Sequence, residues 1–138
     1  MRRRQSLAAL AALPLVLVAG CAQDDPLGRD LAQQPVRVVF FEDDSIALGA
    51  EALTVIQAAA EVARRYPLAP VRVLGYTAPD PDHAPIAGLA RARAEHVTAE
   101  LVRFGIARPR IEVRGRGPVA FDAQPIESRR VEIHIGPN

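Results

Sequence analysis

Short segments with the alternation of β-strands are interleaved in this chain with two longer segments of helical periodicity. From about Ala50 the apolar side chains recur at the spacing of one helix face, and this stripe ends before Pro67. A second stripe covers residues 86–104 and ends at Gly105, a residue suited to the position after a helix. Strand-type patterns rich in β-branched and aromatic residues occupy residues 36–41, 71–76, 110–115 and 129–135.

This order of elements limits the architecture. The order β-α-β-α-β-β predicts an α+β domain of two layers, with both helices on one face of a mixed four-stranded sheet. The first strand has apolar residues on both faces, so we expect it in a largely buried setting. Gly49 is expected to cap the first helix, and Pro118 and Pro125 mark an irregular connection before the last strand.

The first residues have the pattern of an export signal. Arg2 to Arg4 precede an apolar run over residues 7–18 that is too short to span a bilayer comfortably. Small residues then lead directly to Cys21, as in the bacterial lipobox, in which the cysteine becomes the lipidated first residue of the mature chain. We therefore expect a lipoprotein signal peptide over residues 1–20, read by the general or the twin-arginine exporter, and a diacylglyceryl and N-acyl anchor at Cys21.

The segment after the cysteine indicates a tether between lipid and domain and a cellular location. Residues 21–35 are polar without an apolar period, so they are expected to form a flexible tether to a single domain over residues 36–138. Ala22, rather than an aspartate, follows the cysteine. By the sorting pattern of enterobacterial lipoproteins, this predicts a lipid-anchored protein on the periplasmic side of the outer membrane.

Composition excludes one class of partner. Removal of the three arginines of the signal peptide changes the formal charge from +1 to −2, and the chain has no lysine and no basic run. A nucleic-acid partner is not expected, because counterion release needs clustered cations. Cys21 is the only cysteine, so no intramolecular disulfide is expected either.

The junction between the second strand and the second helix is the candidate binding edge. Residues 75–93 contain a strand end, a proline-rich loop and the arginine-bearing start of a helix. A helix start offers free N–H groups to an anion, and Arg93 adds a planar fork suited to a carboxylate. Residues 80–83 lack converging further ligands for a metal, no nucleophile stands beside a base, and no two carboxylates face each other across a cleft. We therefore expect no metal, no cofactor and no enzymatic activity.

Short motifs in a fixed order resemble those of the OmpA-like domain, which occurs in OmpA, in the peptidoglycan-associated lipoprotein and in flagellar motor stators. The resemblance covers residues 38–135, nearly the whole expected domain. The motifs are VFFEDDSIAL at 39–48, GYT at 75–77, LARARA at 89–94, GRG at 115–117 and SRRVEI at 128–133.

The resemblance implies noncovalent binding of peptidoglycan through the free amino-acid end of diaminopimelate in its stem peptide. It assigns the ligand carboxylate to Arg93, but Ala78 stands where the family has the aspartate for the ligand ammonium, and Ile86 replaces an asparagine. Loss of a charge-assisted hydrogen bond weakens binding by about ten- to a hundredfold. Asp80 or Asp82 of the same loop could take its place, although the surrounding prolines limit where their side chains can reach. Further candidate ligand residues are Asp44, Thr77 and one of the adjacent Arg129 and Arg130.

Two functions from different classes remain open. In the first, the chain is a lipoprotein that ties the outer membrane to peptidoglycan, as Arg93 and the retained strand-end motif favour. In the second, the fold has lost its ligand site, as Ala78 favours, and serves as a structural or protein-interaction component of an envelope complex. Each candidate also has a structural alternative, which is solvation for Arg93, a helix cap for Asp44 and a sheet-edge charge for Arg129.

We expect Cys21→Ser to abolish membrane attachment, because the serine hydroxyl cannot take the place of the thiol that carries the lipid. Cell fractionation should move the protein into soluble or precursor forms, whereas Ala22→Ser, which leaves the cysteine in place, should stay with the membrane. A processed Cys21→Ser chain that still requires detergent for its release would contradict the lipid assignment.

Overall fold

The computed structural model describes residues 26–79, 88–120 and 122–137. The signal peptide, Cys21 and Asp80 lie outside these ranges, so what the sequence predicts for them stays a prediction. None of the helices described is both long and apolar enough to cross a bilayer. The elements in chain order are α1 (Pro26–Ala32), β1 (Arg37–Phe40), α2 (Ala50–Arg65), β2 (Val71–Thr77), α3 (Leu89–Arg103), η1 (Arg108–Arg110), β3 (Ile111–Pro118), η2 (Pro125–Glu127) and β4 (Arg130–Ile135).

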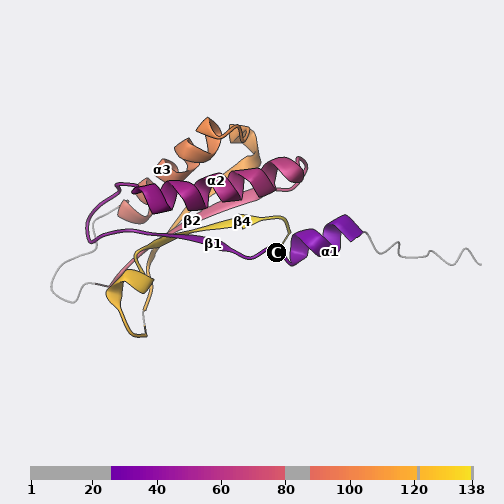
Figure 1. Cartoon of the computed structure of the whole chain (residues 1–138). Helices are drawn as coiled ribbons and strands as arrows, with labels where there is room; N and C mark the ends of the chain where they lie inside the picture. Colours follow the sequence, from indigo (N-terminus) through magenta and orange to yellow (C-terminus); the bar gives the residue numbers. More distant parts are fainter. Residues whose placement is uncertain (1–25, 80–87, 121, 138) are drawn as a thin grey trace, which may run out of the picture.

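The strands form one mixed four-stranded sheet in the order β1-β4-β2-β3. β4 pairs antiparallel with both β1 and β2, whereas β2 and β3 are parallel neighbours joined through α3. α2 and α3 lie on the same side of this sheet, and the loop from β1 to α2 turns at one end of it (Figure 1). The expected α+β architecture, with helices on one face of a mixed sheet, is confirmed.

Strand β1 is less buried than its apolar composition suggests. Val39 and Phe41 are each 1% exposed and belong to the core, but Val36 and Phe40 are 45% and 51% exposed. Side chains alternate between the two faces of a strand, and the helices cover only one face of this sheet. The expectation of a largely buried setting is therefore wrong for half of this strand.

Both expected long helices form, and their ends follow the local sequence. Gly49 is the N-cap of α2, as expected, and the helix ends at Arg65, just before Pro67. α3 is described from Leu89, while the expected start at residue 86 lies outside the described residues. Gly105 has a φ of +94°, which is costly for other residues, and the Ile106 N–H donates to the Leu101 carbonyl at 3.0 Å.

The segment expected as a flexible tether contains a short helix. α1 covers Pro26–Ala32, and its proline stands at the helix start, where a missing N–H removes no helical hydrogen bond. Leu31 packs against the core and lies close over Gly136, just after β4, where a Cβ would be 2.6 Å from the Leu31 Cγ. α1 thus lies beside the end of the chain (Figure 1). Residues 26–32 of the expected flexible tether are thus helical, and Leu31 packs this helix against the domain.

A pair of glycines lets α3 approach the sheet closely. Gly75 in β2 and Gly115 in β3 are register partners. A Cβ at Gly75 would lie 1.8 Å from the Ala90 carbonyl oxygen, and a Cβ at Gly115 would lie 3.0 Å from the Arg91 backbone nitrogen. The first turn of α3 therefore rests directly on the two strands, with no side chain between, and this contact sets how deep Arg93 reaches.

We expect Gly75→Ala to destabilise the fold by about 3 kcal/mol, because the added methyl group meets backbone that cannot rotate away. The measurement is a chemical denaturation of both variants, followed by circular dichroism. Gly49→Ala is the matched control, since a Cβ there meets nothing within 4 Å and the φ is −79°, so that the less favoured alanine N-cap should cost no more than about 1 kcal/mol. Equal stability of the two variants would show that α3 does not rest on β2 in this way.

Candidate functional site

Arg93 organises the end of the domain where β2 stops and α3 begins. It lies on the same stripe of α3 as Ala90 and Val97 and is 0% exposed. Among the described residues, its guanidinium donates to backbone carbonyls alone. Nε donates to the Ser45 carbonyl at 2.9 Å, Nη1 to that of Tyr76 at 3.5 Å, and Nη2 to two carbonyls at the start of the loop after β1. These last two belong to Glu42, at 3.1 Å, and Asp43. One buried side chain thus ties the β1–α2 loop to the end of β2.

Burial and neighbouring charges act against each other at Arg93. Burial is the main cause that lowers the pKa of the Arg93 guanidinium, and the positive charge of Arg129 lowers it further. The carboxylates of Asp44 and Asp43 act in the opposite direction. The ring of Phe41, whose centroid lies 5.1 Å from the Arg93 Cζ, adds a cation–π contact. Arginine nevertheless stays charged in proteins, so the site holds a buried cation compensated by carbonyl dipoles and by acids at its rim.

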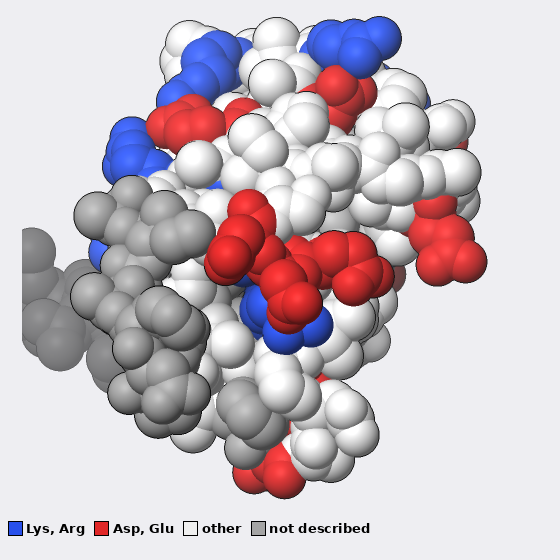
Figure 2. Space-filling model, turned by 90° about the vertical axis from the view of Figure 1, so that its left-hand side faces the viewer, with Lys and Arg blue, Asp and Glu red and all other residues white. Residues whose placement is uncertain are grey.

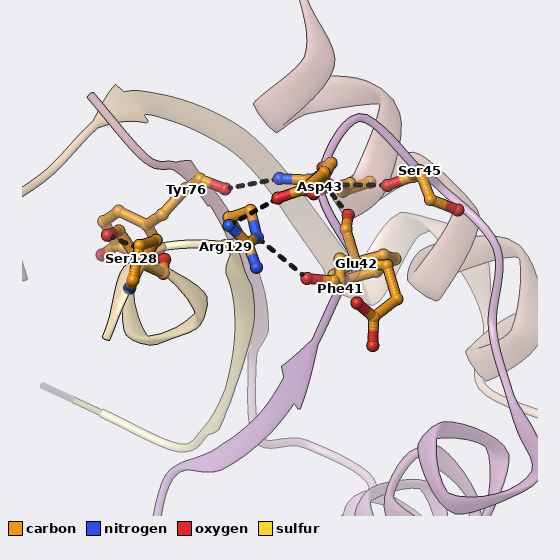
Figure 3. Close-up of polar contacts among 9 residues, drawn as sticks. Phe41, Glu42, Asp43, Ser45, Tyr76, Ser128 and Arg129 are labelled. Carbon is orange, nitrogen blue, oxygen red and sulfur yellow. Dashed lines mark hydrogen bonds and ion pairs between the residues drawn. The ribbon is translucent and has the colours of Figure 1, made fainter. Parts of the chain in front are cut away.

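Arg129 provides the second cation of this site. Its side chain is 17% exposed and forms an ion pair with Asp43, whose own side chain is 86% exposed, with 2.7 Å between Nη1 and Oδ1. Its Nε donates to the Phe41 carbonyl at 3.3 Å. Figure 3 shows the Arg129 side chain between Phe41 and Asp43. On the surface of this end of the molecule, acidic side chains gather around a small basic area (Figure 2).

The other candidates from the sequence lie around these two arginines or outside the described residues. Thr77 ends β2 and is 6% exposed, and its hydroxyl has no hydrogen-bond partner among the residues that the structure describes. Asp44 is exposed in the β1–α2 loop, where it contributes to the electrostatic environment of Arg93. Ala78 follows Thr77 directly and is half-buried, whereas Asp80 is not described. The structure therefore brings Arg93, Arg129, Asp44 and Thr77 to one end of the sheet.

The adjacent arginines at the start of β4 point to opposite faces of the sheet. Arg130 lies on the face away from the helices, with its Cζ 4.5 Å from the ring centroid of Tyr76 and its Nε 2.8 Å from the Glu132 carboxylate. His134 contacts the other oxygen of this carboxylate at 3.0 Å. Burial by itself raises the pKa of Glu132, but the hydrogen bonds and positive charges of Arg130 and His134 together lower it below its ordinary value. Arg129, and not Arg130, is thus the arginine of this pair that reaches the candidate site.

This arrangement suits a small ligand that carries both charges. The Arg129 guanidinium, whose side chain is 17% exposed, has the geometry to bind a carboxylate, and the acids of the β1–α2 loop can bind an ammonium. Within the described ranges, no group of histidine, cysteine and acidic side chains is placed to hold a metal ion. Sequence reasoning missed the Arg93–carbonyl contacts and the role of Asp43. The signal for the first was present, because Arg93 stands at helical spacing from both Ala90 and Val97.

Comparison with known proteins identifies the domain. A model described as the OmpA family matches residues 40–132. The chain is 32% identical over 109 residues to "Probable lipoprotein YiaD" of Escherichia coli, covering 72% of this chain and 48% of that protein. The chain therefore spans about half the length of the curated relative that it matches.

Solved structures share the fold at low sequence identity. The peptidoglycan-associated lipoprotein of Burkholderia pseudomallei is 21% identical with a TM-score of 0.63, covering 72% of this chain and 89% of that one. The C-terminal domain of MotB from Helicobacter pylori is 22% identical with a TM-score of 0.63, covering 73% and 84%. The OmpA-like domain of FopA1 from Francisella tularensis is 18% identical with a TM-score of 0.62, covering 74% and 72%. At these identities the similarity shows the fold alone.

We expect Arg93→Ala to destabilise the domain by about 2–4 kcal/mol, because it leaves a cavity and several buried carbonyls without a donor. Arg93→Lys should lose most of the same stability, since one ammonium cannot reproduce the planar fork. The exposed Arg91→Ala, which removes only a helix-surface pair with Glu95, should change stability by less than about 0.5 kcal/mol. Denaturant unfolding of the three variants would show the difference. An Arg93→Ala domain as stable as Arg91→Ala would contradict the assigned role.

Proposed function

Because the chain belongs to the OmpA family, we propose that it is an exported lipoprotein that attaches its membrane to peptidoglycan. The attachment is noncovalent and takes the free amino-acid end of diaminopimelate in the stem peptide. The site at the ends of β2 and β1, with Arg93 inside and Arg129 at its opening, is the binding site. No catalytic step is part of this proposal.

The placement of charged groups at one end of the sheet is the observation that carries the proposal. The ligand end is a zwitterion. The Arg129 guanidinium and the acids of the β1–α2 loop offer it a positive and a negative group close together in space. The buried Arg93 fixes the loop backbone that bears these acids. A preorganised loop has less conformational entropy to lose on binding, which strengthens its contact with the ligand.

The N-terminus supplies the second attachment. A lipid at Cys21 would hold the chain to the outer membrane, from its periplasmic side, and the protein of similar sequence in Escherichia coli is named a probable lipoprotein. Two weak attachments on one chain act together, because the first keeps the second at a high effective concentration. With the short helix α1 docked on the domain, the segment left to link lipid and domain is short.

A second candidate function rests on Ala78. Without an aspartate at this position, the domain lacks one partner that the resemblance assigns to the ligand ammonium. In this alternative the domain binds no peptidoglycan, and its surface serves as a structural or protein-interaction component of an envelope complex. The buried Arg93 is compatible with this alternative too, because its contacts stabilise the fold by themselves.

The two functions predict different outcomes in a sedimentation experiment with purified peptidoglycan sacculi. We expect the full chain, held in detergent, to co-sediment with sacculi and to be released by free diaminopimelate. Ala78→Asp should strengthen this binding by about tenfold, since it adds a carboxylate for the ligand ammonium. Ala107→Asp adds the same charge ahead of β3, away from the end of the sheet that bears Thr77, and should leave binding unchanged.

The parent and the variant together distinguish the alternatives. A parent chain that does not sediment, together with a clear gain in Ala78→Asp, would identify a domain that has given up its ligand. Failure of both proteins to bind, with thermal melts showing that both are folded, would contradict peptidoglycan binding altogether. Arg93→Ala is no substitute for this test, because the variant also disturbs the loop.

A further inference from the structure

Two connections meet at the end of the domain opposite the candidate site. Arg64, in the last turn of α2, donates from Nη1 to the carbonyl of Phe104, the residue that follows α3. Arg110, just before β3, donates from Nη2 to the carbonyls of Tyr66 at 2.8 Å and Ala69 at 2.9 Å, in the turn after α2. These hydrogen bonds hold the turn between α2 and β2 against the connection between α3 and β3.

Positive charge is concentrated at this end. Residues 62–70 and 101–111, which form the two connections and the helix turns before them, contain no acidic residue and five arginines, namely Arg64, Arg65, Arg103, Arg108 and Arg110. Three more of the 17 arginines lie in the expected signal peptide, so nine remain against 16 acidic residues in the rest of the mature chain. The formal charge is therefore +5 in the two segments and −7 elsewhere. At the opposite end, Figure 2 shows acidic side chains around the candidate site.

An exposed leucine stands beside these arginines. Leu68 is 98% exposed, the highest value among the exposed large hydrophobic side chains of the described residues. Pro67 and Pro70 restrict the backbone on either side of it, and the Ala69 N–H closes the turn by donating to the Tyr66 carbonyl at 3.0 Å. Peripheral binding to a membrane grows with the apolar area that it buries and with the attraction of basic residues to anionic lipids. This end of the domain offers both.

Helix α1 brings the same end close to the expected lipid anchor. Leu31 of α1 lies over Gly136, whose N–H donates to the Pro70 carbonyl, in the turn after α2, at 2.9 Å. α1 thus lies at the end of the domain where α2 stops, and the β1–α2 loop turns at the other (Figure 1). α1 begins five residues after Cys21, and five residues of extended chain span at most about 18 Å. The basic end, rather than the candidate site, is therefore the part of the domain nearest to a lipid on Cys21.

We propose that this basic end docks on the anionic phospholipid surface of the membrane that holds the lipid anchor. Leu68 inserts between the headgroups, and the exposed arginines around it contact the lipid phosphates. This inference rests on the lipid anchor of the proposed function and deepens it, because docking gives the domain an orientation. The strands then lead away from the membrane, and the candidate site at the far end of the sheet faces the peptidoglycan.

The first test follows the depth of residue 68 in the membrane. The full chain is reconstituted into vesicles as Leu68→Cys and labelled with a small apolar thiol dye, which takes the place of the leucine side chain. In vesicles that contain phosphatidylglycerol, the dye emission should shift to shorter wavelength and be quenched by spin-labelled lipid. Ile46→Cys is the matched control, because residue 46 is 44% exposed in the β1–α2 loop and should show neither effect. Equal quenching at both positions, or none at residue 68, would overturn the docking.

The second test measures the part played by charge. Arg65→Gln in the labelled chain should lower the ratio of docked to undocked domains by about fivefold, because it removes one cation from the anionic surface. Arg91→Gln, at the start of α3, removes the same charge from the other end of this helix and should leave the ratio unchanged. Vesicles of phosphatidylcholine alone should quench much less. Inorganic phosphate at matched ionic strength should not release the dye, and release would identify a site for a single anion and overturn membrane docking.

The arginines also have a structural alternative. Arg65 stands in the last turn of α2, where a cation favours the helix by itself. A thermal melt of the same variant separates the two roles. A lower melting temperature of Arg65→Gln with unchanged quenching would limit Arg65 to the helix and overturn its part in docking, whereas a parent-like melt with reduced quenching is the result expected.

The outcomes distinguish this inference from the proposed function. A chain that sediments with sacculi but shows no quenching at residue 68 would keep the proposed function and overturn the docking. A chain that docks but does not bind sacculi would keep the docking and overturn peptidoglycan binding. The parent is the labelling control, since its only cysteine is expected to be a thioether. A parent that takes the thiol dye at Cys21 would lack the lipid anchor, and both proposals would be overturned.

Discussion

The hydrogen bonds from the Arg93 guanidinium to the backbone of the β1–α2 loop stabilise the end of the domain that contains the candidate site. They join three elements that are far apart in sequence, because the side chain comes from α3 and its acceptors lie in the loop after β1 and at the end of β2. A buried cation is costly unless its donors are satisfied, so the loop has little freedom to move away. The position of the acids on the surface is therefore a consequence of an interaction inside the domain.

Backbone geometry makes this interaction possible. Gly75 and Gly115 lie side by side in the sheet, and any larger residue at Gly75 would meet the Ala90 carbonyl. The resulting close approach of α3 sets the depth at which Arg93 enters the space between the strand ends and the loop. The glycines therefore affect the site indirectly, because they set the distance between α3 and the two strands. A ligand bound at the site would depend on this distance without contacting the glycines.

The two faces of the sheet place their arginines in different surroundings. On the face under the helices, Arg129 stands near Arg93, and the repulsion between these cations is relieved by Asp43 and Asp44. On the open face, Arg130 stacks on Tyr76 and pairs with Glu132, so that polar groups cover part of a sheet surface with no helix above it. Adjacent residues reach these different environments only because they stand on alternate sides of a strand.

Local pattern determined the two long helices, the four strands and their order along the chain. The stripes of α2 and α3, the cap at Gly49 and the end at Gly105 all arise from neighbouring residues, whose spacing and backbone preferences the sequence carries directly. The resemblance to a known domain indicated the family and the end of the sheet at which a binding site was expected. Tertiary structure decided that Arg93 is buried, that Arg129 rather than Arg130 reaches the site, that Asp43 is its partner, and that Leu31 docks a segment expected to be loose. Each of these depends on strand register or on contacts between residues distant in the chain, and no local pattern specifies which distant groups will meet.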